Sequence, residues 1–141
     1  MSLPETPALV ADCVAFDAID RVLLVRRKNE PFKGWHALPG GFVRIGETVE
    51  EACRRELMEE TAMEAGRLEL LGVYSDPNRD PRGHTCSVTY VARVATATPR
   101  PGDDAEAAEW MGDWSGLDLA FDHAIILADA KRRLRRFPIL A

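Results

Sequence analysis

Apolar residues recur along this chain in short runs that are rich in β-branched side chains, a pattern that favours strands. Such runs occupy 8–16, 21–27, 35–42, 67–75, 84–94 and 107–112. The first two flank the turn sequence DAID and predict a β-hairpin. Counting the short segments, we expect about seven strands.

Two segments instead show the apolar spacing and end signals of helices. In the segment 48–61, Thr48 followed by Glu51 fits a capping box, in which each side chain bonds the other residue's backbone N–H. The second helix is predicted at 122–137, with Asp122 as its cap. Strands mixed with helices predict an α/β (α+β) fold with a mixed sheet between helices. Neither a repeat nor a linker divides the sequence, so we expect a single domain over 1–141.

Composition and charge exclude several classes of function. The net charge is −5, with 23 acidic and 18 basic residues, which argues against a nucleic-acid surface. The basic run KRRLRR falls at a helix C-terminus, where the helix dipole favours cations, and is interpreted as a solvated face. Three dispersed cysteines, no apolar stretch long enough for a membrane span and no signal peptide predict a cytoplasmic protein without membrane contact.

The sequence RRELMEETAM places three glutamates, Glu56, Glu59 and Glu60, within one and a half turns of the first helix. Like charges at this spacing repel, and on a helical wheel these residues continue the apolar stripe. A solvated acidic face is the alternative, but it would avoid that stripe. A bound divalent cation, which takes oxygen ligands, explains the clustering better. Arg55 lies one turn before Glu59 and can orient its carboxylate.

The segment 41–63, GFVRIGETVEEACRRELMEETAM, resembles the Nudix box. The matching positions are Gly41, Glu47, Arg55, Glu56, Leu57, Glu59, Glu60 and Met63, and the one departure is Ala62, where the family has glycine. The chain is therefore identified as a member of the Nudix family, which implies an α/β/α sandwich. If Ala62 adopts a left-handed conformation, alanine costs about 1 kcal/mol there relative to glycine.

The resemblance also implies roles for individual residues. Glu56, Glu59 and Glu60 are expected to bind Mg²⁺ or Mn²⁺, together with the backbone carbonyl of Gly40. We assign catalytic roles to Glu59, Arg55 and Glu106, the last from the acidic loop 102–106, although a solvated turn explains that loop equally well. Gly41 and Glu47 are expected to hold the geometry of the box. Which carboxylate acts as the base stays open.

Weaker sequence similarities outside the box indicate the substrate. The segments 74–85 and 119–134 resemble the ADP-ribose pyrophosphatases of the family. Arg79 and Arg82 are expected to bind substrate oxygens, although pairing with Asp76 and Asp80 explains them equally well. We assign Trp35 to stacking on the base, against the common alternative that strand aromatics belong to the core. His84 and His123 are interpreted as structural.

We therefore expect a small nucleotide as the partner and metal-dependent hydrolysis of ADP-ribose to AMP and ribose 5-phosphate. The alternatives are a nucleoside triphosphate or dinucleoside polyphosphate hydrolase, and a module that senses ADP-ribose without cleaving it. A sensor would be expected to have an eroded box and a DNA-binding domain, whereas every box glutamate is present here. The resemblance also suggests a homodimer.

Overall fold

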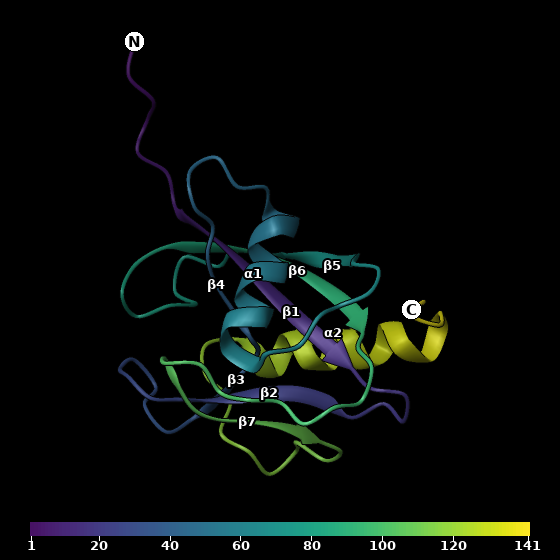
Figure 1. Ribbon diagram of the computed structural model, residues 1–141. Helices are drawn as coiled ribbons and strands as arrows, with labels where there is room; N and C mark the ends of the chain where they lie inside the picture. The colour runs from purple at the N-terminus through teal and green to yellow at the C-terminus, as the bar shows by residue number, and fades with distance from the viewer.

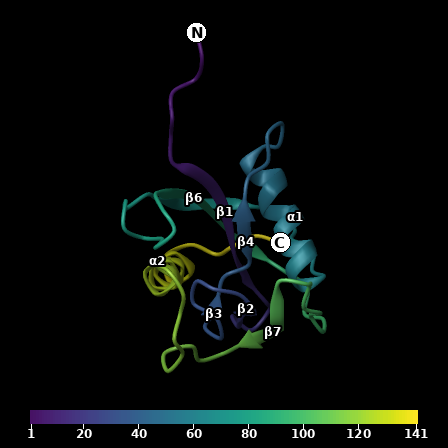
Figure 2. The ribbon, with the colours of Figure 1, turned by 90° about the vertical axis from the view of Figure 1, so that its left-hand side faces the viewer.

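A computed structural model describes residues 1–141, and it shows one sheet with a helix on each face (Figures 1 and 2). The predicted α/β/α arrangement is confirmed. The elements in chain order are β1 (Ala8–Phe16), β2 (Val22–Arg27), β3 (His36–Ala37), β4 (Gly40–Phe42), α1 (Val49–Thr61), β5 (Glu69–Tyr74), β6 (Thr85–Arg93), β7 (Ala105–Met111) and α2 (His123–Arg136).

The sheet is organised around β1, which pairs with three other strands. Its whole length runs parallel to β6, while β2 and β4 pair with it antiparallel. The strand order is β3-β2-β1-β6-β5, with β4 on β1 and β7 on β2. The sheet is mixed, as predicted. The predicted hairpin of β1 and β2 is reduced to one register pair, Phe16 with Val22.

Both faces of the sheet are covered, and the alternation of side chains along β1 shows why. Ala11, Cys13 and Ala15 point into the cluster beneath α1. Val14 and Phe16 point into the cluster beneath α2. A strand that buries both faces is apolar at almost every position, and in 8–16 only Asp12 is polar. Figure 2 shows the two helices on opposite sides of the sheet.

The ends of α1 follow from its sequence. Thr48 and Glu51 form both hydrogen bonds of the predicted capping box. At the other end, Ala62 terminates the helix with φ 61° and ψ 23°, and its N–H donates to Met58. This left-handed conformation favours glycine, the residue that the Nudix box has at this position.

Two predictions about local structure were wrong. Asp122 precedes α2, but its carboxylate does not cap the helix, because Arg79 binds it through two hydrogen bonds. The predicted strand 35–42 is two strands, since His36–Ala37 pairs with β2 and Gly40–Phe42 pairs with β1. Leu38 and Pro39 carry the chain from one partner to the other. None of the helices is long and apolar enough to cross a membrane.

Candidate active site

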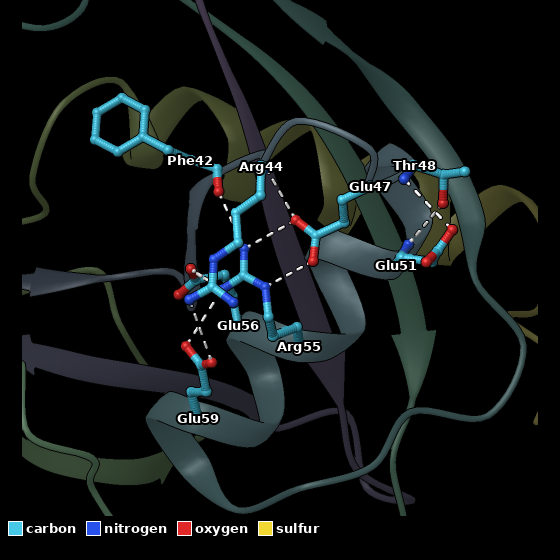
Figure 3. Close-up of polar contacts among 8 residues, drawn as sticks. All are labelled: Phe42, Arg44, Glu47, Thr48, Glu51, Arg55, Glu56 and Glu59. Atoms are coloured by element: carbon cyan, nitrogen blue, oxygen red, sulfur yellow. Dashed lines mark hydrogen bonds and ion pairs between the residues drawn. The ribbon is translucent and has the colours of Figure 1, made fainter.

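Arg55 is the central hydrogen-bond donor on the acidic face of α1 (Figure 3). Its Nε and Nη2 donate to the two carboxylate oxygens of Glu47, at 2.7 and 3.0 Å. Its Nη1 donates to Glu56 at 2.6 Å and to Glu59 at 3.2 Å, and Nη2 also donates to the carbonyl of Phe42. The Arg55 guanidinium lowers the pKa of Glu47 to about 2. One arginine thus joins the loop before the helix to the carboxylates on the helix.

Gly40 and Gly41 let the backbone of β4 approach carboxylates on both sides. A Cβ on Gly41 would lie 2.6 Å from the carboxylate of Glu56. A Cβ on Gly40 would overlap Oδ1 of Asp12 on β1. Any larger residue would have to displace these side chains, so the Gly-Gly pair is required by close approach rather than by a turn.

Glu56 and Glu60 lie where negative charge is poorly solvated. The N–H of Gly40 donates to Glu60 at 3.0 Å, and Glu60 has no ion pair. Burial, with Glu56 and Asp12 nearby, raises the pKa of Glu60 to about 8. Burial also raises the pKa of Glu56, although the Arg55 hydrogen bond opposes this. The two carboxylates therefore favour a cation between them.

The loop before β7 brings further carboxylates to the end of α1. The N–H groups of Arg100 and Gly102 donate to the carbonyls of Thr61 and Glu60, which fixes the loop against the helix. Asp103 and Asp104 consequently line a first cavity together with Glu56, Glu59 and Glu60.

Glu106 lines neither this cavity nor a second one that shares Glu56, Glu60 and Asp104 with it, and its carboxylate lies 3.6 Å from Arg26. Its catalytic role stays a prediction, while Asp104 borders both cavities.

The second cavity, about 310 Å³, is lined by Glu56 and Glu60 of α1 and by His123 at the start of α2. Three arginines line it, and their pairing differs. Arg79 is buried and bound to Asp122, and Arg82 is bound to Asp80. Arg27 has no carboxylate partner, and burial lowers its pKa.

Arg82 is thus paired with Asp80, as the alternative interpretation held, while Arg79 pairs with Asp122 instead of Asp76. Sequence reasoning missed Arg27, because nothing in a strand ending Arg-Arg distinguishes it from Arg26.

Aromatic residues other than the predicted Trp35 form the wall of the cavity. Trp35 is 40% exposed and packs on Phe32, outside the lining. Phe42 and Phe121 line the cavity, and the Arg82 guanidinium lies 5.3 and 5.7 Å from their ring centres. His123 also lines it, whereas His84 bonds the carbonyl of Ser75.

The carboxylates of α1 suit a hard divalent cation, which prefers oxygen ligands. Burial raises the pKa of Glu60, and no side chain forms an ion pair with it, so a bound cation would stabilise its ionised form. No three acidic, histidine or cysteine side chains converge on a single point. A cation held by Glu56, Glu59 or Glu60 would therefore complete its coordination with water and with ligand oxygens, as Mg²⁺ commonly does.

Comparison with known proteins places this site in a family. The NUDIX domain family matches residues 6–137. The chain is 49% identical over 127 residues to an ADP-ribose pyrophosphatase of Methanocaldococcus jannaschii, covering 89% of this chain and 74% of that protein. It is 33% identical to an ADPR responsive transcriptional repressor of Acinetobacter baylyi, covering 92% of this chain and 55% of the repressor.

Among solved structures, the NUDIX domain of Shewanella oneidensis NrtR, complexed with ADP ribose, superposes with a TM-score of 0.86. It is 33% identical, and the match covers 92% of this chain and 90% of that one. The chain belongs to the Nudix family, as its box predicted. Nudix hydrolases use divalent metal ions.

Proposed function

We propose that this protein hydrolyses the diphosphate bond of ADP-ribose and releases AMP and ribose 5-phosphate. The observation that carries the proposal is that one 310 Å³ cavity is lined both by the carboxylates Glu56 and Glu60 and by Arg27, Arg82 and Phe121. The carboxylates suit a cation that meets a diphosphate, and an aromatic and cationic wall suits a nucleoside. The identity of 49% with an ADP-ribose pyrophosphatase supports the same substrate.

Several residues of the site have a part in the proposed reaction. Mg²⁺ or Mn²⁺, when bound, would neutralise the diphosphate and acidify an attacking water. Glu59, half-exposed and oriented by Arg55, is the proposed base that takes the proton of that water. Arg27 has no carboxylate partner, its Nε donates to the carbonyl of Pro31, and its Nη groups are proposed to meet a phosphate oxygen. Arg79 also lines the cavity, where Asp122 holds its guanidinium.

The sensing alternative draws on the repressor relative, of which this chain spans about half. It predicts binding of ADP-ribose without turnover. The complete set of box glutamates favours catalysis instead, because a sensor has no need of a carboxylate that activates water. We also propose that the protein forms a homodimer, as its resemblance to the family suggests.

The experiment is hydrolysis of ADP-ribose by the wild type and by Glu60→Gln, over a range of Mg²⁺ concentrations. The wild type should release AMP, and the variant should lose turnover by orders of magnitude while keeping its fold, as measured by circular dichroism. Glu50→Gln is the matched control, since Glu50 lies on the same helix and is exposed away from the cavity. If Glu60→Gln kept wild-type turnover, the assignment of Glu60 as a metal ligand would be refuted. If the wild type bound ADP-ribose without cleaving it, the result would favour a sensor.

A further inference from the structure

Phe121 lies in a tight turn whose backbone suits glycine better than an aromatic residue. The N–H of His123 donates to the carbonyl of Ala120 at 3.0 Å and closes the turn. Between these two residues Phe121 has φ 55°, in the left-handed region that a bulky side chain rarely adopts. The N–H of Ala120 donates to the carbonyl of His36 at 2.8 Å, so β3 fixes where the turn lies. Backbone strain of this kind persists where the surrounding structure requires a side chain in one position.

The ring of Phe121 is already in contact with four side chains, two of them cations. The Arg27 guanidinium lies over the ring at 5.0 Å from its centre, and the Arg82 guanidinium lies at 5.7 Å. The ring of Phe32 meets it edge-on at 5.0 Å, centre to centre, and the ring of His123 lies at 5.3 Å. An aromatic face attracts a guanidinium through its quadrupole. Phe121 thus holds an arginine from β2 and an arginine from the loop before β6 next to one another.

The two guanidiniums give this part of the cavity an excess of positive charge. Arg82 pairs with Asp80 at 2.8 Å. The side chain of Arg27 makes one hydrogen bond, from Nε to the carbonyl of Pro31 at 2.7 Å, and no ion pair. Burial, followed by the charge of Arg82, lowers the pKa of Arg27. Like charges held near each other repel, and an anion that contacts both removes the repulsion.

The arginines lie across β4 from the carboxylate of Glu56. A Cβ on Gly41 would point at that carboxylate. Phe42 is the next residue of the strand, so its side chain points to the opposite face, where the Arg82 guanidinium lies 5.3 Å from its ring centre. A cation at Glu56 and an anion at the arginines therefore do not compete for one place, although both groups line the same cavity.

We propose that Phe121 is a positioning residue: its ring holds the guanidiniums of Arg27 and Arg82 together so that both bind the diphosphate of the substrate. This inference rests on the proposed function, from which it takes a diphosphate as the ligand. It gives the ring of Phe121 a role other than stacking on the base. Removal of the ring should therefore weaken binding through the arginines.

The test is the binding of a methylene analogue of ADP-ribose, in which carbon replaces the bridging oxygen of the diphosphate and blocks its hydrolysis. Calorimetry in Mg²⁺ compares the wild type with Phe121→Leu, which lacks an aromatic face, and Phe121→Tyr, which keeps one. We expect Phe121→Leu to raise Kd about three- to tenfold, because it loses two cation–π contacts, and Phe121→Tyr to stay near the wild type. A wild-type Kd for Phe121→Leu, or a wild type that does not bind the analogue, would overturn the proposal.

A double-mutant cycle shows whether Phe121 acts through an arginine. In an Arg27→Met background, Phe121→Leu should raise Kd by a smaller factor than in the wild type, because one contact that it removes is already absent. The same factor in both backgrounds would show that the ring acts on the ligand directly, and the proposal would fail.

Phe32→Leu is the matched control. Phe32 belongs to the same aromatic cluster and also has a left-handed backbone, with φ 60°, but no guanidinium lies over its ring and it does not line the cavity. It should lower the melting temperature as Phe121→Leu does and leave Kd unchanged. An equal rise in Kd for Phe32→Leu would show that lost packing weakens binding, which would overturn the proposal.

Failure of this inference is distinguishable from failure of the proposed function. A wild type that binds the analogue with the expected cycle but leaves ADP-ribose intact would refute the proposed function and keep the role of Phe121. Hydrolysis of ADP-ribose with equal factors in the cycle would do the reverse.

Discussion

Glu60 gives the metal-free protein a stability that falls as the pH rises. In the folded state the pKa of Glu60 is raised from 4.5 to about 8, chiefly by burial. The folded protein therefore favours the protonated carboxyl, and its contribution to stability is fully present below pH 4.5 and lost by about pH 8. Each pH unit in that window corresponds to about 1.4 kcal/mol, so the loss amounts to about 4–5 kcal/mol. This is a large part of the 5–15 kcal/mol typical of a domain.

Glu60→Gln should remove this dependence, because glutamine resembles the protonated carboxyl and still accepts from the N–H of Gly40. The assay is urea unfolding in a chelator at several pH values between 5 and 8. We expect the variant and the wild type to be similar near pH 5 and the variant to be clearly more stable at pH 8. Adding Mg²⁺ at pH 8 should stabilise the wild type more than the variant, since a cation binds the ionised carboxylate.

The matched control is Glu59→Gln, on the same helix with a side chain that is 50% exposed. It should follow the wild-type profile, because its carboxylate is well solvated. Parallel pH profiles for the wild type and Glu60→Gln would show that the Glu60 carboxylate is not buried as described, and the reasoning would fail.

Three further substitutions test the geometry of the site. Ala62→Gly should raise the unfolding free energy by up to about 1 kcal/mol, because the residue ends α1 in the left-handed region; a destabilised variant would contradict this in thermal melts. Gly41→Ala should lower kcat with little change in melting temperature, since the new methyl displaces the Glu56 carboxylate; unchanged kcat would refute the close approach. Arg79→Lys should lower stability by about 1–3 kcal/mol in urea unfolding, because lysine cannot make both hydrogen bonds to Asp122, and an unchanged midpoint would count against that pair.

The elements whose signals are local were predictable from the sequence. The capping box at Thr48, the end of α1 at Ala62 and the two-sided burial of β1 all follow from neighbouring residues. The break at Leu38 was not predictable, because it arises when the chain changes partner strand, from β2 to β1.

Within the site, the spacing of the glutamates on one helix predicted the acidic cluster, but the sequence did not predict the opposite wall of the cavity. Asp12 and His123 are 111 positions apart and line the same cavity only because of the fold, and neither stands in a motif. Arg79 was predicted to bind substrate, yet its guanidinium is bound to Asp122, a partner 43 positions away. Which arginine stays unpaired depends on such distant contacts, so composition and spacing could not single out Arg27.

The central claim is that the cavity cleaves ADP-ribose at its diphosphate. The most direct measurement is chromatography of the products formed when the protein and Mg²⁺ act on equal concentrations of ADP-ribose and a damaged nucleoside triphosphate. We predict that AMP and ribose 5-phosphate accumulate first while the triphosphate is still intact. Release of pyrophosphate and a damaged nucleoside monophosphate, with ADP-ribose unconsumed, would contradict the account.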